Sequence, residues 1–249
     1  MQTQQGDMRK ASKSLIPTVA TLCNLGAGFI AIALALEGDP YLAALLVISA
    51  VLFDSLDGML ARAFRAASEF GRELDSLADM VSFGVAPAVI VGALLPDQIA
   101  TFGWLMLVAF PFCAAVRLAR FNVKRLHSAS HGSFVGLAST GAGGCVASAV
   151  LTEGVLTEHG VHIGAGVLPW VLLVLGLLMI STISYPHVRS LLSRMAPPSL
   201  VAAAAVFVLA AAYWQHELVF LAVFWGYAAS GPALAVKEKI RAFRVAHSR

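Results

Sequence analysis

Long apolar runs alternate with short polar segments along most of this chain. One of them, YLAALLVISAVLF at residues 41–53, contains no polar side chain other than a tyrosine and a serine. A helix needs about 20 largely apolar residues to cross the hydrocarbon core of a bilayer, and runs of about that length recur. The pattern predicts eight transmembrane helices, at residues 15–36, 41–61, 76–96, 99–118, 133–152, 162–184, 198–214 and 218–236.

The composition agrees with a lipid environment. Of the 249 residues, 59% are hydrophobic and only 12% are charged, whereas a soluble domain carries about 25% charged residues. We therefore expect an all-α integral membrane protein. It would have a basic N-terminal segment at residues 1–14, a single transmembrane domain at 15–236 and a basic tail at 237–249.

The distribution of charge predicts the orientation of the helices. With eight spans, all 17 Lys and Arg residues fall on the side that also holds both termini, and the connections on the other side carry acidic residues only. Loops rich in Lys and Arg stay in the cytoplasm, so we expect both termini to be cytoplasmic, in the inner membrane of a bacterium. The basic ends would lie near anionic lipid headgroups. No basic patch is interleaved with aromatic residues, so we expect no nucleic-acid partner.

Four aspartates interrupt the apolar pattern between the second and third spans. Asp54 and Asp57 lie on one face of the second helix, and Asp75 and Asp79 lie four residues apart on one face of the third. The connection at 62–71 is short enough to make these helices antiparallel neighbours, so the carboxylates can converge near the cytoplasmic surface. Hard oxygen ligands of this kind suit Mg²⁺ or Mn²⁺.

Small residues share these two helical faces. Gly58 and Ala61 accompany the first aspartate pair, and Gly71 accompanies the second. They leave space for a bulky ligand to approach the backbone, and Arg62 can bind a phosphate group through two hydrogen bonds. The pattern by itself therefore predicts a carboxylate metal site that faces the cytoplasm, without naming a reaction.

The same stretch resembles the signature of a known enzyme family. It fits D-x2-D-G-x2-A-R-x8-G-x3-D-x3-D, the signature of the CDP-alcohol phosphotransferases, over 26 residues. Members are integral membrane enzymes with a six-helix catalytic core that displace CMP from a CDP-alcohol with a second alcohol. The matching positions are Asp54, Asp57, Gly58, Ala61, Arg62, Gly71, Asp75 and Asp79.

Three flanking stretches resemble the branch of the family that uses serine as the acceptor. They are IPTVATLCNLGAGFIAI, GRELDSLADMVSFGVAPA and RLARFNV. The resemblance implies transfer of a phosphatidyl group from CDP-diacylglycerol to the hydroxyl of L-serine, with release of CMP and formation of phosphatidylserine. It also implies a divalent cation and allows a homodimer, because homodimers are known in the family. At 136–144 the chain reads GLASTGAGG, where the serine enzymes tend to have GLP followed by a second proline.

The resemblance also assigns roles to residues. It implies that Asp54, Asp57, Asp75 and Asp79 bind the metal and that Asp79 also accepts the proton of the incoming hydroxyl. It implies that Gly58, Arg62 and Ser68 contact the CDP-lipid. The polar residues Asn24, Arg117, Arg120 and Asn122 lie in or at the ends of spans and are candidate substrate contacts.

Three other functions remain open. A sister enzyme could use glycerol phosphate, inositol phosphate or choline as the acceptor. A divalent-cation transporter could use the same aspartates, although transport favours acidic residues near the middle of the membrane, and here they gather at one edge. A membrane scaffold without catalytic activity would place no chemical requirement on Asp79.

Overall fold

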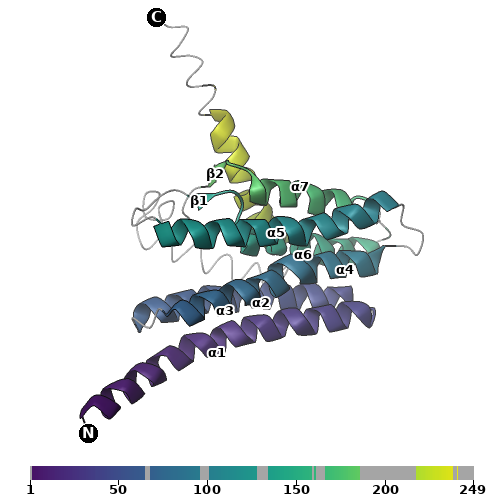
Figure 1. Cartoon of the computed structure of the whole chain (residues 1–249). Coiled ribbons are helices and arrows are strands. Elements are labelled where there is room, and N and C mark those ends of the chain that lie inside the picture. Colours follow the sequence, from purple (N-terminus) through teal and green to yellow (C-terminus); the bar gives the residue numbers. More distant parts are fainter. Residues whose placement is uncertain are drawn as a thin grey trace, which may run out of the picture.

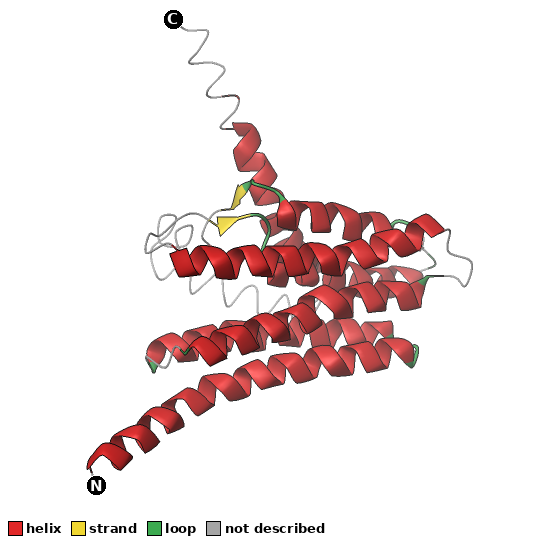
Figure 2. Cartoon of the chain, in the orientation of Figure 1, coloured by secondary structure: helices red, strands yellow, loops and turns green. Residues whose placement is uncertain are grey.

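Helices make up nearly all of the described chain. The structure, a computed structural model, describes residues 2–64, 68–95, 101–127, 134–158, 160, 166–185, 217–237 and 240. Figure 2 shows the helices together with one pair of very short strands. The elements are α1 (Gln2–Leu36), α2 (Pro40–Ala63), α3 (Glu69–Asp79), η1 (Met80–Val85), α4 (Ala86–Leu94), α5 (Thr101–His127), β1 (Phe134–Val135), α6 (Ser139–Glu158), α7 (Leu168–Ile180) and β2 (Ser184–Tyr185), followed by the helix Glu217–Lys237.

The helices from α1 to α7 run in alternating directions along a common bundle axis, with α3, η1 and α4 forming one continuous span (Figure 1). Helix α1 packs along α2 and α3, α5 packs along α7, and α6 packs against α2. The end of α2, the start of α3 and the end of α5 therefore lie at the same end of the bundle. The last helix crosses the bundle obliquely, since Glu217 contacts Tyr41 near the start of α2 and Ala228 contacts Tyr185 of β2.

The prediction of an all-α membrane protein is confirmed in its coarse form. Within the described residues, five helices are long and apolar enough to cross a membrane: Pro17–Leu36, Pro40–Ala63, Glu69–Leu94, Phe102–Val123 and Glu217–Lys237. They correspond to the first four predicted spans and the eighth. The predicted seventh span, 198–214, lies outside the described residues. The total of eight spans, the three-part division of the chain and the cytoplasmic position of both termini stay predictions.

Several boundaries differ from those that hydropathy indicates. Helix α1 begins at Gln2 and so includes nearly all of the predicted basic N-terminal segment, residues 1–14. The third span begins at Glu69, seven residues earlier than expected, because the charged first turn of α3 continues directly into the apolar helix. In place of a span that starts at 133, the chain forms β1 and a turn before α6 begins at Ser139.

The third span contains a π-helical segment, η1, directly after Asp79. Pro87 explains its place: a proline has no N–H to donate to the carbonyl four residues earlier and its ring collides with that carbonyl. Widening the helix before Pro87 relieves both problems, and the N–H of Ala86 bonds to Val81 instead. Such segments often occur at functional sites, and this one follows the last of the four aspartates.

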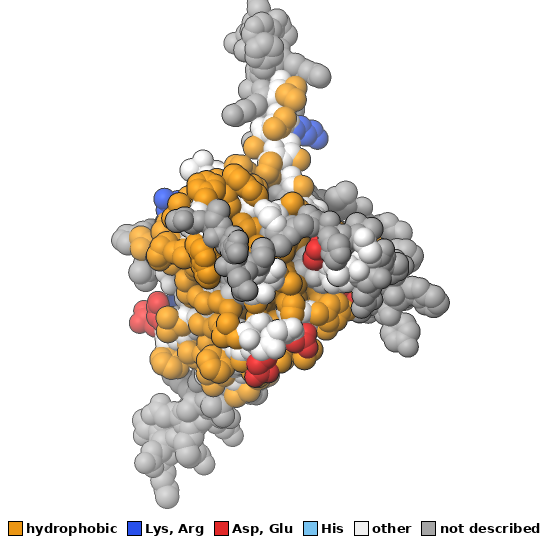
Figure 3. Space-filling view, turned by 90° about the vertical axis from the view of Figure 1, so that its right-hand side faces the viewer, with side chains coloured by type: hydrophobic (Ala, Val, Ile, Leu, Met, Phe, Trp, Pro, Cys, Tyr) orange, Lys and Arg blue, Asp and Glu red, His pale blue; other side chains and the backbone are white. Residues whose placement is uncertain are grey.

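Apolar side chains cover much of the outside of the bundle. Phe29, Leu36, Trp104 and Phe112 are each more than half exposed, which in water would be a large unfavourable surface. Figure 3 looks along the bundle from the end opposite the start of α1 and shows orange hydrophobic surface with a few acidic groups. This surface is the one expected of a protein surrounded by lipid.

Candidate functional site

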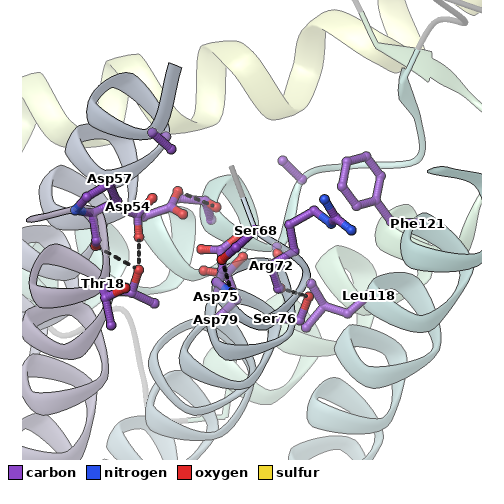
Figure 4. A pocket seen from close by; sticks show the side chains of 18 of the residues that line it. Thr18, Asp54, Asp57, Ser68, Arg72, Asp75, Ser76, Asp79, Leu118 and Phe121 are labelled. Carbon is purple, nitrogen blue, oxygen red and sulfur yellow. Dashed lines mark hydrogen bonds between the residues drawn. The ribbon is translucent and has the colours of Figure 1, made fainter. Parts of the chain in front are cut away.

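A cavity of about 460 Å³ lies between α1, α2, α3, α5 and the start of α6 (Figure 4). Ten of the predicted site residues line it, and they come from α2, from α3 with its N-cap Ser68, and from α5. Its lining residues are Pro17, Thr18, Thr21, Asp54, Asp57, Gly58, Ala61, Arg62, Ser68, Gly71, Arg72, Asp75, Ser76, Asp79, Arg117, Leu118, Phe121, Ala138, Ser139 and Thr140.

The aspartates meet in this cavity. One carboxylate oxygen from each of Asp54, Asp57 and Asp75 lies within 4.8 Å of the others, a spacing that could hold a metal ion. Asp79 lines the same cavity one turn beyond Asp75 on α3 and is only 8% exposed. Figure 4 shows the α2 pair facing the α3 pair across the cavity. The antiparallel α2–α3 arrangement expected from the short connection does bring the two faces together.

Neutral donors from other helices hold three of the carboxylates. The hydroxyl of Thr21 on α1 donates to Asp57 over 2.8 Å, and both side chains are buried. The hydroxyl of Thr140 on α6 donates to Asp54 over 3.3 Å. The amide nitrogen of Asn24 on α1 donates to Asp79 over 3.4 Å. These three aspartates are thus held from two helices, α1 and α6, that contribute no carboxylate of their own to the cluster.

The donor set fits a divalent cation. Among the described residues, no Lys or Arg forms an ion pair with Asp54, Asp57 or Asp79. Several carboxylates gathered in a partly buried place repel one another unless a positive charge compensates them. All the converging ligand atoms are carboxylate oxygens, the type that Mg²⁺ and Mn²⁺ prefer.

The starts of two helices also line the cavity. Ser68 caps α3, and its hydroxyl accepts a hydrogen bond from the Gly71 N–H over 3.0 Å. Ser139 and Thr140 form the first turn of α6. The N–H groups in the first turn of a helix carry partial positive charge and favour bound anions such as phosphate. The cavity therefore combines a cation-binding cluster with two anion-favouring helix ends.

A tight turn places the start of α6 at the cavity. Strand β1 pairs with β2 in antiparallel register, and the Gly136 N–H donates to the carbonyl of Ile183 over 2.8 Å. Gly136 has φ of +83°, and a Cβ atom there would collide with the carbonyl oxygen of Met179. Only glycine fits this position, so the turn ties the start of α6 to the end of α7.

The predicted residues of the fourth span separate into different environments. The Arg117 guanidinium lines the cavity and is held by the carbonyl of Leu137 and by the Ser139 hydroxyl. Arg120 instead donates to the carbonyl of Ile180, the last residue of α7, over 3.0 Å. Asn122 exchanges hydrogen bonds with Ser76 of α3 beside the cavity. Arg120, Asn122 and Asn24 are not among the lining residues.

Sequence reasoning overlooked the hydroxyl groups that hold the aspartates. Thr21 belongs to a polar and small-residue stripe on α1, formed by Pro17, Thr21, Asn24 and Gly28 at helical spacing. That stripe was a usable signal, since it marks the face of α1 turned toward the aspartates. No periodic signal pointed to Thr140, which reaches the cavity through the packing of α6. Arg72 lies three residues before Asp75 and seven before Asp79, a helical spacing that was a usable signal.

Comparison with known proteins identifies a family over most of the bundle. Residues 14–179 match the family model described as CDP-alcohol phosphatidyltransferase. The match therefore extends from the cavity-lining part of α1 to the end of α7.

Several curated relatives carry names from lipid biosynthesis. A CDP-diacylglycerol–serine O-phosphatidyltransferase of Mycobacterium leprae is 39% identical over 122 residues, 49% of this chain and 40% of the relative. Its namesake in Bacillus subtilis is 31% identical over 174 residues, 70% of this chain and 91% of the relative. An archaetidylserine synthase of Methanothermobacter thermautotrophicus is 32% identical over 187 residues, 73% of this chain and 74% of the relative. The mycobacterial match spans less than half of that relative's length.

Proposed function

Because the chain belongs to the CDP-alcohol phosphatidyltransferase family, we propose that it transfers the phosphatidyl group of CDP-diacylglycerol to L-serine. The products would be phosphatidylserine and CMP, and the reaction would serve phospholipid biosynthesis. The observation that carries the proposal is the convergence of Asp54, Asp57 and Asp75 inside a cavity whose lining includes the whole family signature.

The charge around the cavity suits a lipid-linked diphosphate. We assign the diphosphate to the space between the aspartates and the first turns of α3 and α6, with the Arg62 and Arg117 guanidinium groups as further contacts. Gly58, Ala61 and Gly71 present no large side chain there, so the nucleotide can lie close to the helix backbones. The acyl chains would remain in the surrounding lipid.

Asp79 is the proposed general base. Its carboxylate accepts the proton of the serine hydroxyl while the serine oxygen forms a bond to the phosphorus of the phosphatidyl group. The bond from that phosphorus to the bridging diphosphate oxygen breaks, and CMP leaves with this oxygen. A positioned base contributes roughly 10²- to 10⁴-fold to such a step. Burial of Asp79 beside Asn24 keeps its carboxylate in one place.

Asp54, Asp57 and Asp75 are the proposed ligands of a divalent cation. Asp79, one turn beyond Asp75 on α3, is proposed as a further ligand. A bound Mg²⁺ or Mn²⁺ supplies positive charge that stabilises the diphosphate and the departing CMP. The threonine hydroxyls on Asp54 and Asp57 orient these carboxylates.

Serine is the acceptor we favour because the Mycobacterium leprae and Bacillus subtilis relatives are named for serine transfer. The name of the archaeal relative also refers to serine. Ser139 and Thr140 belong to the GLASTGAGG segment, where the chain departs from the pattern of the serine enzymes. These side chains border the cavity and are candidates for acceptor selection.

An acceptor-competition assay tests the proposal. Purified protein in mixed micelles would receive CDP-diacylglycerol with radiolabelled serine, glycerol phosphate, inositol phosphate or choline, each with Mg²⁺, with Mn²⁺ and with EDTA. We expect label in phosphatidylserine only when serine and a divalent cation are both present, with CMP released in equal amount. Preferential labelling from another acceptor would reject the serine assignment, and equal labelling in EDTA would reject the role of the cation.

A further inference from the structure

Helix α1 carries none of the four aspartates, yet it contacts two of them. Thr21 and Asn24 lie three residues apart on the face of α1 that packs against α2 and α3. Thr21 reaches Asp57 on α2, and Asn24 reaches Asp79 on α3. We infer that α1 positions the acidic site in two separate ways: Thr21 orients a cation-binding carboxylate, and Asn24 orients the carboxylate of the general base.

Burial supports a positioning role for both side chains. Thr21 is 4% exposed and Asn24 is fully buried. Asn24 does not line the cavity, so it touches the reacting groups only through Asp79. This differs from the expectation that Asn24 contacts substrate. The inference rests on the proposed function because it takes Asp79 as the base.

The hydrogen bond to Asp79 orients the buried side chain of Asn24. Its backbone carbonyl accepts a hydrogen bond from Ser82 of η1 over 2.9 Å, so α1 is tied to the π-helical segment that follows Asp79. Its Oδ1 has no hydrogen-bond partner among the described residues. A buried acceptor without a partner is unfavourable, and only the bond from its amide nitrogen to Asp79 compensates for burial of the amide.

Thr21 has a different arrangement. Its single hydroxyl proton has two acceptors within reach, Asp57 over 2.8 Å and the carbonyl of Pro17 over 3.1 Å. Asp57 is the nearer of the two, and it belongs to the group of three carboxylates that could hold the cation. Groups that hold a metal-binding residue in place typically change affinity or activity about 10- to 100-fold when they are removed.

The test uses paired variants with two readouts. Thr21→Val removes the hydroxyl at nearly constant shape, Thr21→Ser keeps it, and Asn24→Leu removes the amide while keeping the number and branching of the heavy atoms. Thr152→Val is the matched control, because Thr152 is a buried threonine whose hydroxyl, within the described part of the chain, bonds to a carbonyl of its own helix, that of Ser148. Mn²⁺ affinity is measured by electron paramagnetic resonance without substrate, and kcat and KM for serine are measured at saturating Mn²⁺.

We expect Thr21→Val to weaken Mn²⁺ binding about 10-fold. Thr21→Ser, which keeps the hydroxyl, should bind Mn²⁺ as the unaltered protein does. Asn24→Leu should lower kcat about 10- to 100-fold, with KM for serine and Mn²⁺ affinity within about 3-fold of the unaltered protein. Size-exclusion profiles should match those of Thr152→Val. A raised serine KM at unchanged kcat in Asn24→Leu would make Asn24 a substrate contact and overturn its half of the inference.

Two further outcomes would also overturn the inference. One is Mn²⁺ affinity in Thr21→Val equal to that of Thr152→Val, and the other is an equal loss of Mn²⁺ affinity in Asn24→Leu and Thr21→Val. The Mn²⁺ measurements need no turnover, so they stand even if the acceptor assay rejects serine. Failure of the positioning inference is thereby distinguishable from failure of the proposed function.

Discussion

At the scale of single residues, the role of a charged side chain depends on which group or cavity it contacts in the folded protein. Its presence in the sequence does not determine that contact. Arg117 and Arg120 are one helical turn apart on α5, yet Arg117 faces the cavity and Arg120 bonds to the end of α7. Among the aspartates, Asp54, Asp57 and Asp75 form the close group, and Asp79 lies deeper beside Asn24. Substitutions at this scale should therefore separate binding from chemistry.

Replacing the proposed base tests its role directly. Asp79→Asn should lower serine incorporation by roughly 10²- to 10⁴-fold, because an amide cannot accept the proton of the hydroxyl. Asp39→Asn is the matched control: Asp39 caps α2 at the opposite end of the bundle, and asparagine is an equally good N-cap. Initial rates at saturating substrate would be compared. Activity of Asp79→Asn equal to that of the control would remove Asp79 from the chemistry.

The two arginines of α5 should respond differently to the same change. Arg117→Lys removes the planar group that reaches both Leu137 and Ser139 at the cavity wall. We expect kcat/KM for CDP-diacylglycerol to fall about 10-fold, which corresponds to about 1.4 kcal/mol. Arg120→Lys should change it less than 3-fold, since a lysine can still reach the carbonyl at the end of α7. Equal losses in the two variants would contradict the assignment of Arg117 to the site.

At the scale of elements, the site requires close contact between helices. Helix α1 approaches η1 at Gly28, where an added Cβ atom would lie 2.7 Å from the Cα of Ser82. Helix α6 approaches the same segment at Gly143, where a Cβ would lie 3.1 Å from the Cα of Phe83. The π-helical segment is thus held between two glycines, and this contact sets the depth of Asp79 between α1 and α6.

A pair of glycines on α1 provides the test of this contact. Gly28→Ala should destabilise the protein by about 1–3 kcal/mol, because the new methyl group meets the backbone of η1. Gly26→Ala on the same helix should be neutral or stabilising by up to about 1 kcal/mol, since no atom of another described segment lies within 4 Å of the added atom. Thermal unfolding in detergent would measure both. Equal midpoints would show that α1 and η1 are not in tight contact.

At the scale of the whole molecule, the candidate site lies at one end of the bundle. The cavity lies at the end where α2 finishes and α3 begins, and the connection at 37–39 lies at the other end. The basic residues of the sequence predict that the cavity end faces the cytoplasm, where CMP and serine are available, because positive loops stay inside. The structure gives the end of the bundle at which the cavity lies. The prediction of which side of the membrane that end faces comes from the charges in the sequence.

Labelling of single cysteines tests this orientation. In a chain whose native Cys23, Cys113 and Cys145 are replaced by alanine, Asp39→Cys should react with a membrane-impermeant maleimide added outside intact cells. Phe64→Cys should react only after the membrane is opened. Asp39 and Phe64 are both exposed and lie at opposite ends of α2. The reverse labelling pattern would place the site on the outer face and contradict the proposed access of serine.

The sequence by itself determined the membrane class of the protein, four helices of the bundle, the last helix and the aspartate cluster. These features depend on local properties: the length of an apolar run, and the repeat of side chains on a helix face. The family signature could likewise be recognised from the sequence, because all of its positions lie in one continuous stretch, Asp54 to Asp79.

Only the tertiary structure decided which groups support that cluster. The donors Thr21, Asn24 and Thr140 lie far from the aspartates in the sequence. No helical repeat connects these donors to the aspartates that they hold. The start of α6 depends on the β1–β2 turn, and the position of the π-helical segment depends on its packing between α1 and α6. Hydropathy measures the affinity of a segment for lipid, whereas these features arise from contacts between segments that are distant in the chain.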